Sequence, residues 1–514
     1  MSRLISLLAL TVGVWSIGGA MQGLEDAMAI QQEQMERLQS FLGPPEGPAI
    51  TRSTMTFSNP AAQKFFVDGT TIPNVNFDAG PSYAGLMPIS ADPNETRKLF
   101  FWFWPTSDAA NTKDLLFWTN GGPGCSSMEG FLQENGPISW SWGQAEPTPN
   151  PFAWNKLGHM VWVEQPVGTG FSQGTPNITN DDELAAEVYG FFQQFLEVFD
   201  ELKGNNLWLS GESYAGFYVP YIANFIYENP GLDVNLKGIW IADPSLSYGV
   251  VQQDIPALRF VQANQNVFPF NSSFMAQLQA TSDTCGYTDY VDKFLTYPPA
   301  GPLPFPAGTN GTTTATTACR IHTPIQRAVG LINPVFNVYR VTDTFPNLWS
   351  VLGFPRATQE FVYFNRTDVQ DAIHAPHIVW ATCAPRSVYL PGGDRTVPSM
   401  LQGAGRNISV MGNVIEKSVR TVVVHGLADM ILMAEGTRIA IQNMTWGGMQ
   451  GFQTPIEPET FTVKGMGVLG NEHTERGLTY IEFFYSGHMT PQFVPFSSWN
   501  SIAYLLGKQP QPST

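Results

Sequence analysis

The sequence G-E-S-Y-A-G at residues 211–216 places one serine between small residues, directly after the apolar run Asn206–Ser210. A strand that ends here and turns sharply into a helix would hold Ser213 in a strained, exposed position, and the small neighbours would leave room for the turn. A hydroxyl held in this way is a candidate nucleophile. Because a Gly/Ser/Ala segment can also be a plain structural turn, the hypothesis depends on finding a base and a carboxylate elsewhere in the chain.

Both partners are present. A nucleophilic serine needs a base that takes its proton and a carboxylate that orients the base, and α/β-hydrolases carry the three in the order Ser, Asp, His. Asp429 follows the apolar segment Thr421–Val424, where a parallel sheet exposes the ends of its strands. His488 lies farther along, in the turn-forming segment S-G-H-M-T-P. These residues predict a Ser213, His488 and Asp429 constellation.

A second loop could stabilise negative charge on a substrate oxygen. The segment W-T-N-G-G-P-G-C-S-S covers residues 118–127, and its glycines leave backbone amides bare enough for close approach, as an oxyanion hole requires. Ser126 and Ser127 lack an elbow around them and are interpreted as structural. His374 and His377 have H-x-x-H spacing, but no third ligand accompanies them in a recognisable spacing, so we expect no metal and no cofactor.

The elements that must position these residues alternate between short apolar runs and helical stretches from about Thr56 onward. Strands that are apolar on both faces are typical of a buried parallel sheet, and the alternation places the fold in the α/β class. A helix is expected at Asp182–Phe199. Strands are expected at Leu99–Trp104, Leu115–Thr119, Met160–Val163, Leu207–Leu209, Gly238–Ile241 and Thr421–Val424.

The chain of 514 residues exceeds the size at which one core stops growing, so an insertion is expected. The stretch between the strands near Ile241 and Val423 is too long for one connection, and we place an inserted subdomain at residues 250–360, between core segments 56–249 and 361–514. Residues 1–20 have the pattern of a secretory signal peptide. In residues 21–55 a helix at Leu24–Leu42 would belong to a propeptide or to an N-terminal strap.

Composition describes a compact acidic protein. Hydrophobic residues make up 43% of the chain and charged residues 13%, and the formal net charge is −17. This balance would repel nucleic acid and anionic lipid. No apolar run after the signal reaches the roughly 20 residues that a membrane span needs. We therefore expect a soluble mature protein without a nucleic-acid partner.

A secretory route makes disulfides and N-linked glycans the expected modifications, and places the protein outside the cell or in a vacuole-like compartment. The four cysteines, Cys125, Cys285, Cys319 and Cys383, would form two disulfides in one of three connectivities. N-x-S/T sequons stand at Asn94, Asn177, Asn271, Asn310, Asn365, Asn407 and Asn443, and most are expected to be exposed.

Together the motifs resemble the serine carboxypeptidase family, over about residues 56–495. The resemblance rests on W-x-N-G-G-P-G-C-S-S from Trp118, G-E-S-Y-A-G from Gly211, V-H-G-x-x-D ending at Asp429 and G-H-M-x-P from Gly487. It implies an α/β-hydrolase fold, with a mostly parallel central sheet, helices on both faces and an inserted helical cap. It also implies removal of single residues from peptide C-termini.

The resemblance assigns roles residue by residue. Ser213 would be the nucleophile, His488 the general acid and base, and Asp429 its orienter, with the amides of Gly122 and Tyr214 as the oxyanion hole. Asn120, Gly121, Glu134 and Glu212 would bind the substrate's C-terminal carboxylate. Because two ionised glutamates would repel that carboxylate, at least one must hold a proton, which predicts activity at acidic pH. The resemblance also pairs Cys125 with Cys383 and Cys285 with Cys319.

Two departures and two alternatives stay open. Where relatives usually carry Asn-Gly after a core strand, this chain has Asp243-Pro244, and it has fewer cysteines than many relatives. Side-chain preference is not predicted, because the cap shapes those pockets. An acyltransferase or esterase could use the same triad. A catalytically silent binding or chaperone protein would be expected to have lost a triad residue, and none is lost.

Overall fold

The computed structural model describes residues 57–309, 315–343, 350–353, 362–390, 400–401 and 409–514, together with residues 29, 32 and 33. The predicted signal peptide and the sequons at Asn310 and Asn407 lie outside the described residues. Of the predicted helix at Leu24–Leu42, only residues 29, 32 and 33 are described, and these three are helical. Residues 1–51 form a unit separate from residues 52–514, and the description below concerns the second unit.

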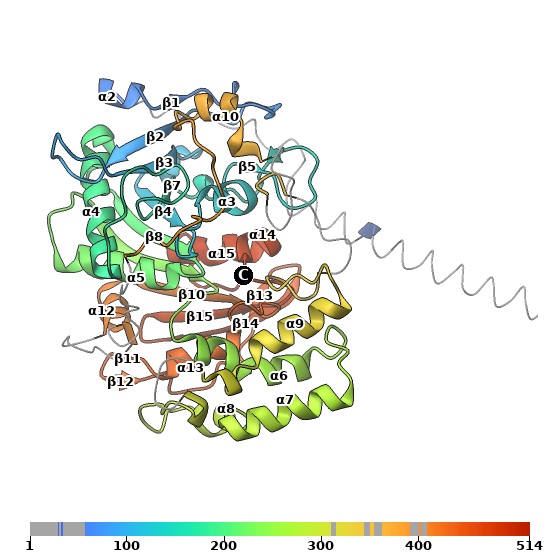
Figure 1. The fold of residues 1–514 in the computed structure, drawn as a ribbon. Coiled ribbons are helices and arrows are strands. Elements are labelled where there is room, and N and C mark those ends of the chain that lie inside the picture. The colour runs from blue at the N-terminus through green and yellow to red at the C-terminus, as the bar shows by residue number, and fades with distance from the viewer. Residues whose placement is uncertain are drawn as a thin grey trace, which may run out of the picture. The chain divides into compact units, whose positions relative to one another are not determined.

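The second unit is built on a sheet whose described strands follow the order β1-β2-β3-β7-β4-β8-β9-β10-β15-β14-β13 (Figure 1). The strands from β7 to β15 in this order run parallel, and the pairs outside them are antiparallel. The strands are β1 (Phe66–Val67), β2 (Ser82–Pro88), β3 (Lys98–Trp104), β4 (Asp114–Thr119), β5 (Ile138–Ser139), β6 (Thr148–Pro149), β7 (His159–Glu164), β8 (Asn206–Glu212), β9 (Asn235–Ala242), β10 (Arg420–Gly426), β11 (Thr445–Trp446), β12 (Met449–Gln450), β13 (Phe461–Val463), β14 (Gly467–Glu475) and β15 (Leu478–Phe483).

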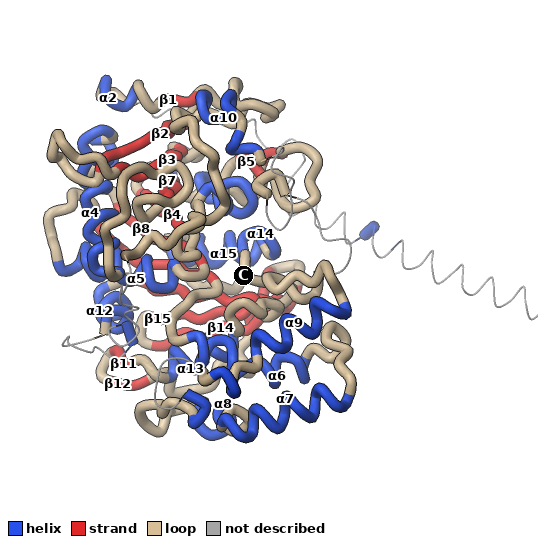
Figure 2. Tube along the Cα trace, in the orientation of Figure 1, coloured by secondary structure: helices blue, strands red, loops and turns tan. Residues whose placement is uncertain are grey.

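Helices cover both faces of this sheet, so the predicted α/β-hydrolase architecture is confirmed (Figure 2). Each of the six predicted strands is present, and the predicted helix at Asp182–Phe199 is α4. The described helices are α2 (Pro60–Gln63), α3 (Met128–Gly130), α4 (Asp181–Val198), α5 (Ala215–Glu228), α6 (Ile255–Ala263), α7 (Ser272–Cys285), α8 (Tyr290–Phe294), α9 (His322–Ile332), α10 (Thr367–Ala372), α12 (Val410–Lys417), α13 (Ala434–Gln442), α14 (Thr490–Phe493) and α15 (Pro495–Leu505).

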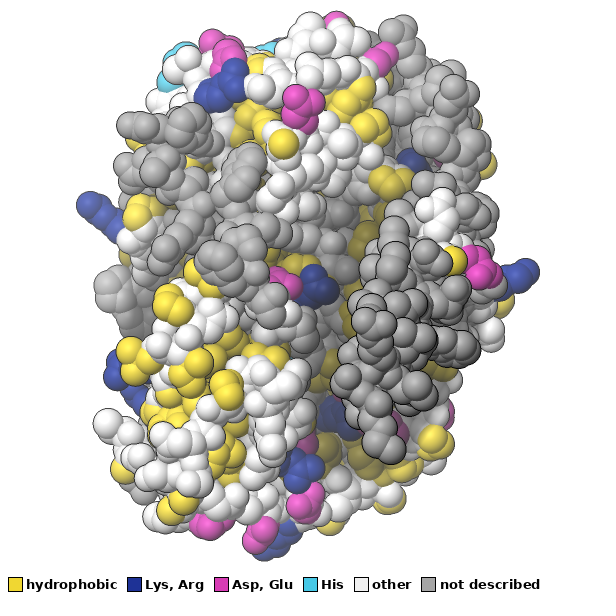
Figure 3. Space-filling model, turned by 90° about the vertical axis from the view of Figure 1, so that its right-hand side faces the viewer, with side chains coloured by type: hydrophobic (Ala, Val, Ile, Leu, Met, Phe, Trp, Pro, Cys, Tyr) yellow, Lys and Arg dark blue, Asp and Glu magenta, His cyan; other side chains and the backbone are white. Residues whose placement is uncertain are grey.

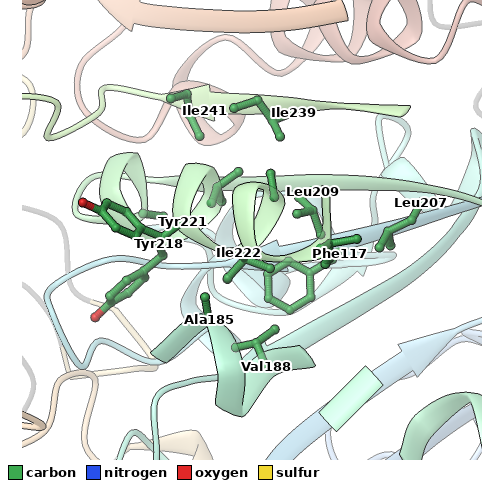
Figure 4. Packing of buried hydrophobic residues seen from close by; sticks show 14 of the residues in the cluster. Phe117, Ala185, Val188, Leu207, Leu209, Tyr218, Tyr221, Ile222, Ile239 and Ile241 are labelled. Carbon is green, nitrogen blue, oxygen red and sulfur yellow. The ribbon is translucent and has the colours of Figure 1, made fainter. Parts of the chain in front are cut away.

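Side chains along β3 alternate between the two faces of the sheet, and both faces are buried. Leu99, Phe101 and Phe103 belong to the hydrophobic cluster that includes α4, α5 and α12. Phe100 and Trp102 point the other way, into the cluster that includes α15, because successive side chains leave a strand on opposite faces. Figure 4 shows the first cluster from close by, with apolar side chains of α4 and α5 packed against those of β4, β8 and β9.

The segment between β9 and β10 holds the helical insertion. Helices α6 to α9 share a third hydrophobic cluster, which also contains Met430 and Ile439 from the segment after β10. Figure 3 shows apolar side chains gathered on the lower half of the face it displays. Among the described residues of the insertion, the large hydrophobic side chains that are exposed are Phe305, Leu331 and Ile332. That residues 250–360 form a cap over the core remains our proposal.

Among the five described sequons, Asn94, Asn177 and Asn271 are exposed. Asn365 and Asn443 are half-buried, and their side-chain oxygens accept hydrogen bonds from Trp380 N and Leu303 N. In the part of the chain that the structure describes, no helix is both long and apolar enough to cross a membrane.

A buried carboxyl group at the end of β7 fixes three neighbouring segments. Glu164 accepts hydrogen bonds from Ser126 Oγ, from Phe171 N and from Trp380 Nε1, and none of its side chain is exposed. Burial raises the pKa of Glu164 to about 7, and the three hydrogen bonds oppose that shift. Glu187 of α4 behaves similarly, since burial raises its pKa to about 7 while Arg97 opposes the rise.

These two groups predict that the free energy of unfolding falls as the pH rises. A carboxyl whose folded pKa lies above its unfolded value of about 4.5 stabilises the fold below that value, and the contribution is lost as the pH rises through about 7. We expect urea unfolding to show a loss on the order of 1 to 3 kcal/mol per group between pH 4.5 and 7.5. Glu164→Gln should reduce this loss, whereas Glu146→Gln at an exposed position should not. An equal loss in Glu164→Gln would contradict the assignment.

Candidate active site

Ser213 lies where β8 turns into α5, and its backbone has a φ of 62°, in the left-handed region. The turn needs small neighbours on both sides. A Cβ on Gly211 would lie 2.4 Å from Thr119 O, and a Cβ on Gly216 would lie 2.5 Å from Ser245 O. Ser213 N donates to Ala242 O, and Ser213 O accepts from Ser245 N. The neighbouring strand end therefore holds the strained conformation in place.

His488 and Asp429 form a buried pair at the same edge of the sheet. Nδ1 of His488 lies 2.7 Å from Oδ2 of Asp429, and their side chains are 3% and 0% exposed. Asp429 follows β10, and its Oδ1 accepts from the amides of Ile431 and Leu432. His488 follows β15 and donates its backbone N–H to Tyr339 O. The hydrogen bond to Asp429 leaves Nε2 of His488 as the nitrogen that can exchange a proton with a substrate or nucleophile.

The glycine loop after β4 lies against the serine turn. A Cβ on Gly121 would stand 2.2 Å from the amide nitrogen of Tyr214, so only glycine allows this approach. Gly122 follows with a φ of 113°, which also favours glycine. Gly122, Ser213 and Tyr214 line the same cavity, so the amides of Gly122 and Tyr214 remain the candidates for the oxyanion hole.

A disulfide and two backbone hydrogen bonds hold this loop from the other side. Cys125 is bonded to Cys383, as the family resemblance implies. Ser126 N donates to Thr382 O, and Ala384 N donates to Gly124 O, on either side of the bridge. The second disulfide joins Cys285 to Cys319 in the insertion.

Asn120, Glu134 and Glu212 meet in a buried group beside the elbow. Asn120 Nδ2 lies 2.9 Å from Oε1 of Glu212 and 3.5 Å from Oε1 of Glu134. The Asn120 side chain cannot flip freely, because its Oδ1 accepts from Trp118 Nε1 and from Gly130 N. The side chains of Glu134 and Glu212 are 5% and 4% exposed, so the structure brings together the residues that the sequence predicted.

The two glutamates hold protons at pH values where exposed glutamates are ionised. Burial, followed by the charge of Glu129, raises the pKa of Glu134 to about 8. Burial and the charges of Glu134 and Glu129 raise the pKa of Glu212 well above its ordinary value. A group of this kind can donate hydrogen bonds to an anion, which two carboxylates could not do.

A cavity of about 780 Å³ opens on the other side of Ser213. Its lining includes Gly122, Tyr214 and Phe217 of the core, and Asp254, Arg320 and His322 of the insertion. Asn120, Glu134, Glu212 and His488 are not among its lining residues. Ser213 is therefore reached from a cavity that residues of both the core and the insertion line.

Sequence reasoning did not find two further carboxyl groups of the site. Glu129 of α3 is 8% exposed; burial raises its pKa to about 7, and the charge of His488 lowers it. Asp243, directly after β9, is fully buried beside Asp429. The available signals were the position of Glu129 two residues after the glycine-loop motif and the unusual Asp-Pro pair, but neither indicates which groups lie nearby.

Donor atoms of Asp243, Asp429 and His488 lie within 4.8 Å of one another, a spacing that a metal ion could also use. The His488 Nδ1 and Asp429 Oδ2 atoms already share a short hydrogen bond, so the group fits a proton-transfer role without a metal. His377 of the H-x-x-H pair is exposed and contacts Asp371.

Comparison with known proteins agrees with this geometry. Residues 73–507 match the family described as "Serine carboxypeptidase". The chain is 44% identical to a probable serine carboxypeptidase from Arthroderma benhamiae, over 90% of this chain and 89% of the relative. It is 39% identical to serine-type carboxypeptidase F from Aspergillus niger, over 85% and 86%. The solved structure of Kex1, a prohormone-processing carboxypeptidase from Saccharomyces cerevisiae, has a similar fold, with a TM-score of 0.65, 20% identity, and coverage of 87% and 97%.

The contact between the glycine loop and the elbow predicts a steric effect. Gly121→Ala should slow the reaction of Ser213 with a fluorophosphonate by about 100-fold or more, because the new Cβ would displace one amide of the oxyanion site. Gly330→Ala in α9 is the matched control, since a Cβ there would contact nothing within 4 Å. A Gly121→Ala variant that reacts as fast as the wild type would show that the two amides do not act together.

Proposed function

Since the chain belongs to the serine carboxypeptidase family, we propose that it releases single amino acids from the C-termini of peptides and proteins through an acyl-enzyme on Ser213. It is a serine-type carboxypeptidase. The residue roles, the preference for acidic pH and the location in the secretory pathway, outside the cell or in a vacuole-like compartment, belong to the proposal.

The proposed reaction follows from the order of groups around the elbow. Ser213 Oγ attacks the last peptide carbonyl while His488 Nε2 takes its proton, and Asp429 stabilises the resulting imidazolium. The amides of Gly122 and Tyr214 bind the oxyanion. His488 then gives its proton to the leaving nitrogen, and the free amino acid departs. Water attacks the acyl-enzyme by the same route and releases the shortened peptide.

Selection of the C-terminus is assigned to Asn120, Gly121, Glu134 and Glu212. In this proposal Asn120 Nδ2, the amide of Gly121 and at least one protonated glutamate donate hydrogen bonds to the terminal carboxylate. The rest of the peptide would lie in the cavity on the other side of Ser213.

The observation that carries the proposal is the buried Asn120, Glu134 and Glu212 group next to the nucleophile. An esterase or an acyltransferase needs the triad and the oxyanion amides, but it has no need for a proton-holding carboxyl pair, one member of which directly precedes the serine. A free C-terminal carboxylate does need such a group, because an anion can approach the glutamates only while they hold protons.

Hydrolysis of a blocked dipeptide tests the proposal. We expect release of the C-terminal amino acid at pH 4 to 6 and poor release from the matching C-terminal amide, because the amide lacks the charge that the site binds. Ser213→Ala should release nothing. Labelling of Ser213 by a fluorophosphonate without any release from the dipeptide would instead favour the acyltransferase or esterase function.

The carboxyl pair predicts the pH dependence of KM. The pKa of Glu134 is raised to about 8 and that of Glu212 well above its ordinary value, so both hold protons at pH 5, and Glu134 ionises as the pH rises through about 8. KM for the blocked dipeptide should therefore rise about 10-fold or more between pH 5 and 9. The double variant Glu134→Gln and Glu212→Gln, which keeps the shapes and removes the ionisation, should show a KM that varies less than about 3-fold. The C-terminal amide is the control substrate, and an undiminished rise in the double variant would contradict the assignment.

A further inference from the structure

Asp243 lies at the end of β9, beside Asp429, but it does not belong to the proposed triad. It follows β9, with its own φ at 43°, and its backbone N–H donates to Val424 O of β10. Its Oδ1 accepts a 2.8 Å hydrogen bond from Gly426 N. None of its side chain is exposed, so no ordinary surface role accounts for a carboxyl group here.

The second oxygen of this side chain, Oδ2, is buried and lacks a hydrogen-bond donor among the described residues. A carboxyl oxygen of Asp243 and a carboxyl oxygen of Asp429 lie within 4.8 Å of each other. In the described part of the chain, no Lys or Arg nitrogen lies within 4.0 Å of either carboxyl group. Two ionised carboxylates this close in a dry interior would be strongly unfavourable.

His425 cannot supply the missing positive charge. Its Nε2 lies 3.5 Å from Asp243 Oδ1 and 3.7 Å from Asp429 Oδ2, but it donates its proton to Leu432 O at 2.7 Å. Its Nδ1 lies 3.1 Å from Thr437 Oγ1 and accepts from that hydroxyl. Burial lowers the pKa of His425, so both nitrogens are satisfied in the neutral ring.

The hydrogen bonds at Asp429 leave neither of its oxygens without a donor. Its two oxygens accept from the amides of Ile431 and Leu432 and from His488 Nδ1, an arrangement that suits a carboxylate. The proton then belongs to Asp243, whose free Oδ2 is the atom that can carry it.

We propose that Asp243 is a positioning residue that stays protonated and donates a hydrogen bond from Oδ2 to the carboxylate of Asp429. The bond fixes the Asp429 oxygens that orient His488, and it adds no second negative charge beside the imidazole. The surroundings of Asp243 agree with this assignment. Burial raises its pKa well above the ordinary value, and the charges of Asp429 and, to a smaller extent, Glu134 add to the rise. Glu212 also interacts with it.

The inference rests on the proposed triad, and its test uses a readout that does not require peptide recognition. The rate of Ser213 labelling by a fluorophosphonate is measured from pH 3 to 8 for the wild type, Asp243→Asn and Asp243→Leu, with thermal unfolding as the check on folding. The rate falls at acid pH as His488 becomes protonated, and the midpoint of that fall reports the charge near His488.

An asparagine can donate the same hydrogen bond and is neutral at every pH. Asp243→Asn should therefore label within about 3-fold of the wild-type rate, with an unchanged midpoint. Asp243→Leu removes the donor and should label about 10- to 100-fold more slowly. With the blocked dipeptide, its loss should appear in kcat while KM stays unchanged.

Two results would overturn the proposal. If Asp243 were ionised, Asp243→Asn would remove a negative charge and move the midpoint to lower pH by about one unit or more. If Asp243 had no positioning role, Asp243→Leu would label at the wild-type rate. Should Asp243→Leu fail to fold, Asp243→Ala replaces it as the variant without a donor, and the midpoint in Asp243→Asn still decides whether Asp243 is ionised. A wild type that is labelled but releases no amino acid would count against the proposed carboxypeptidase reaction and leave the labelling comparison valid.

Discussion

The active site lies where the parallel strands end, and one constraint governs it. Its carboxyl groups are buried, and no Lys or Arg lies beside them among the described residues. Glu129, Glu134, Glu212 and Asp243 all have raised pKa values, and burial is the first cause in each case. Since cations do not neutralise these groups, protons must do so. Which carboxyl keeps its proton then determines what each can do: an ionised one orients a histidine, and a protonated one donates to an anion.

The sheet itself causes the crowding. Glu212 pairs with Ala242 in the parallel register of β8 and β9, and Ala242 pairs with Val424 in that of β9 and β10. Neighbouring strands lie about 4.8 Å apart, so acidic residues that end adjacent parallel strands must meet. Glycine contacts reduce the space further, because Gly426 packs against the carbonyl of Gly487 and brings the Asp429 and His488 loops together. The same packing that assembles the triad therefore makes charge on the remaining acids costly.

The sequence predicted the residues whose local neighbours determine their conformation, but it did not predict contacts between residues on different strands. Ser213 could be predicted because the glycines that permit its turn are its near neighbours in the chain. Strands β4, β7 and β8 could be predicted because each contains a run of consecutive apolar residues. The hairpin of β14 and β15, which leads to His488, was missed because β14 is largely polar and partly exposed. The contact of Asp243 with Asp429 depends on which strand lies beside β9, and that long-range pairing leaves no periodic signal. The departure from Asn-Gly marked the position but did not reveal its partner.

The two carboxyl pairs around Ser213 resemble each other chemically, yet they face different demands. In the proposed reaction Glu134 and Glu212 receive an anion and share a proton with it, and their second oxygens lack partners among the described donors. Asp243 and Asp429 are fully buried. Three of their four oxygens accept hydrogen bonds, which come from Gly426, Ile431, Leu432 and His488. One proton between the two carboxyl groups would satisfy the fourth oxygen. A rise in pH through about 8 should therefore weaken substrate binding through Glu134 of the first pair. The proposed proton on Asp243 has no substrate to share it with, so the two pairs assign substrate binding and the positioning of the base to different protons.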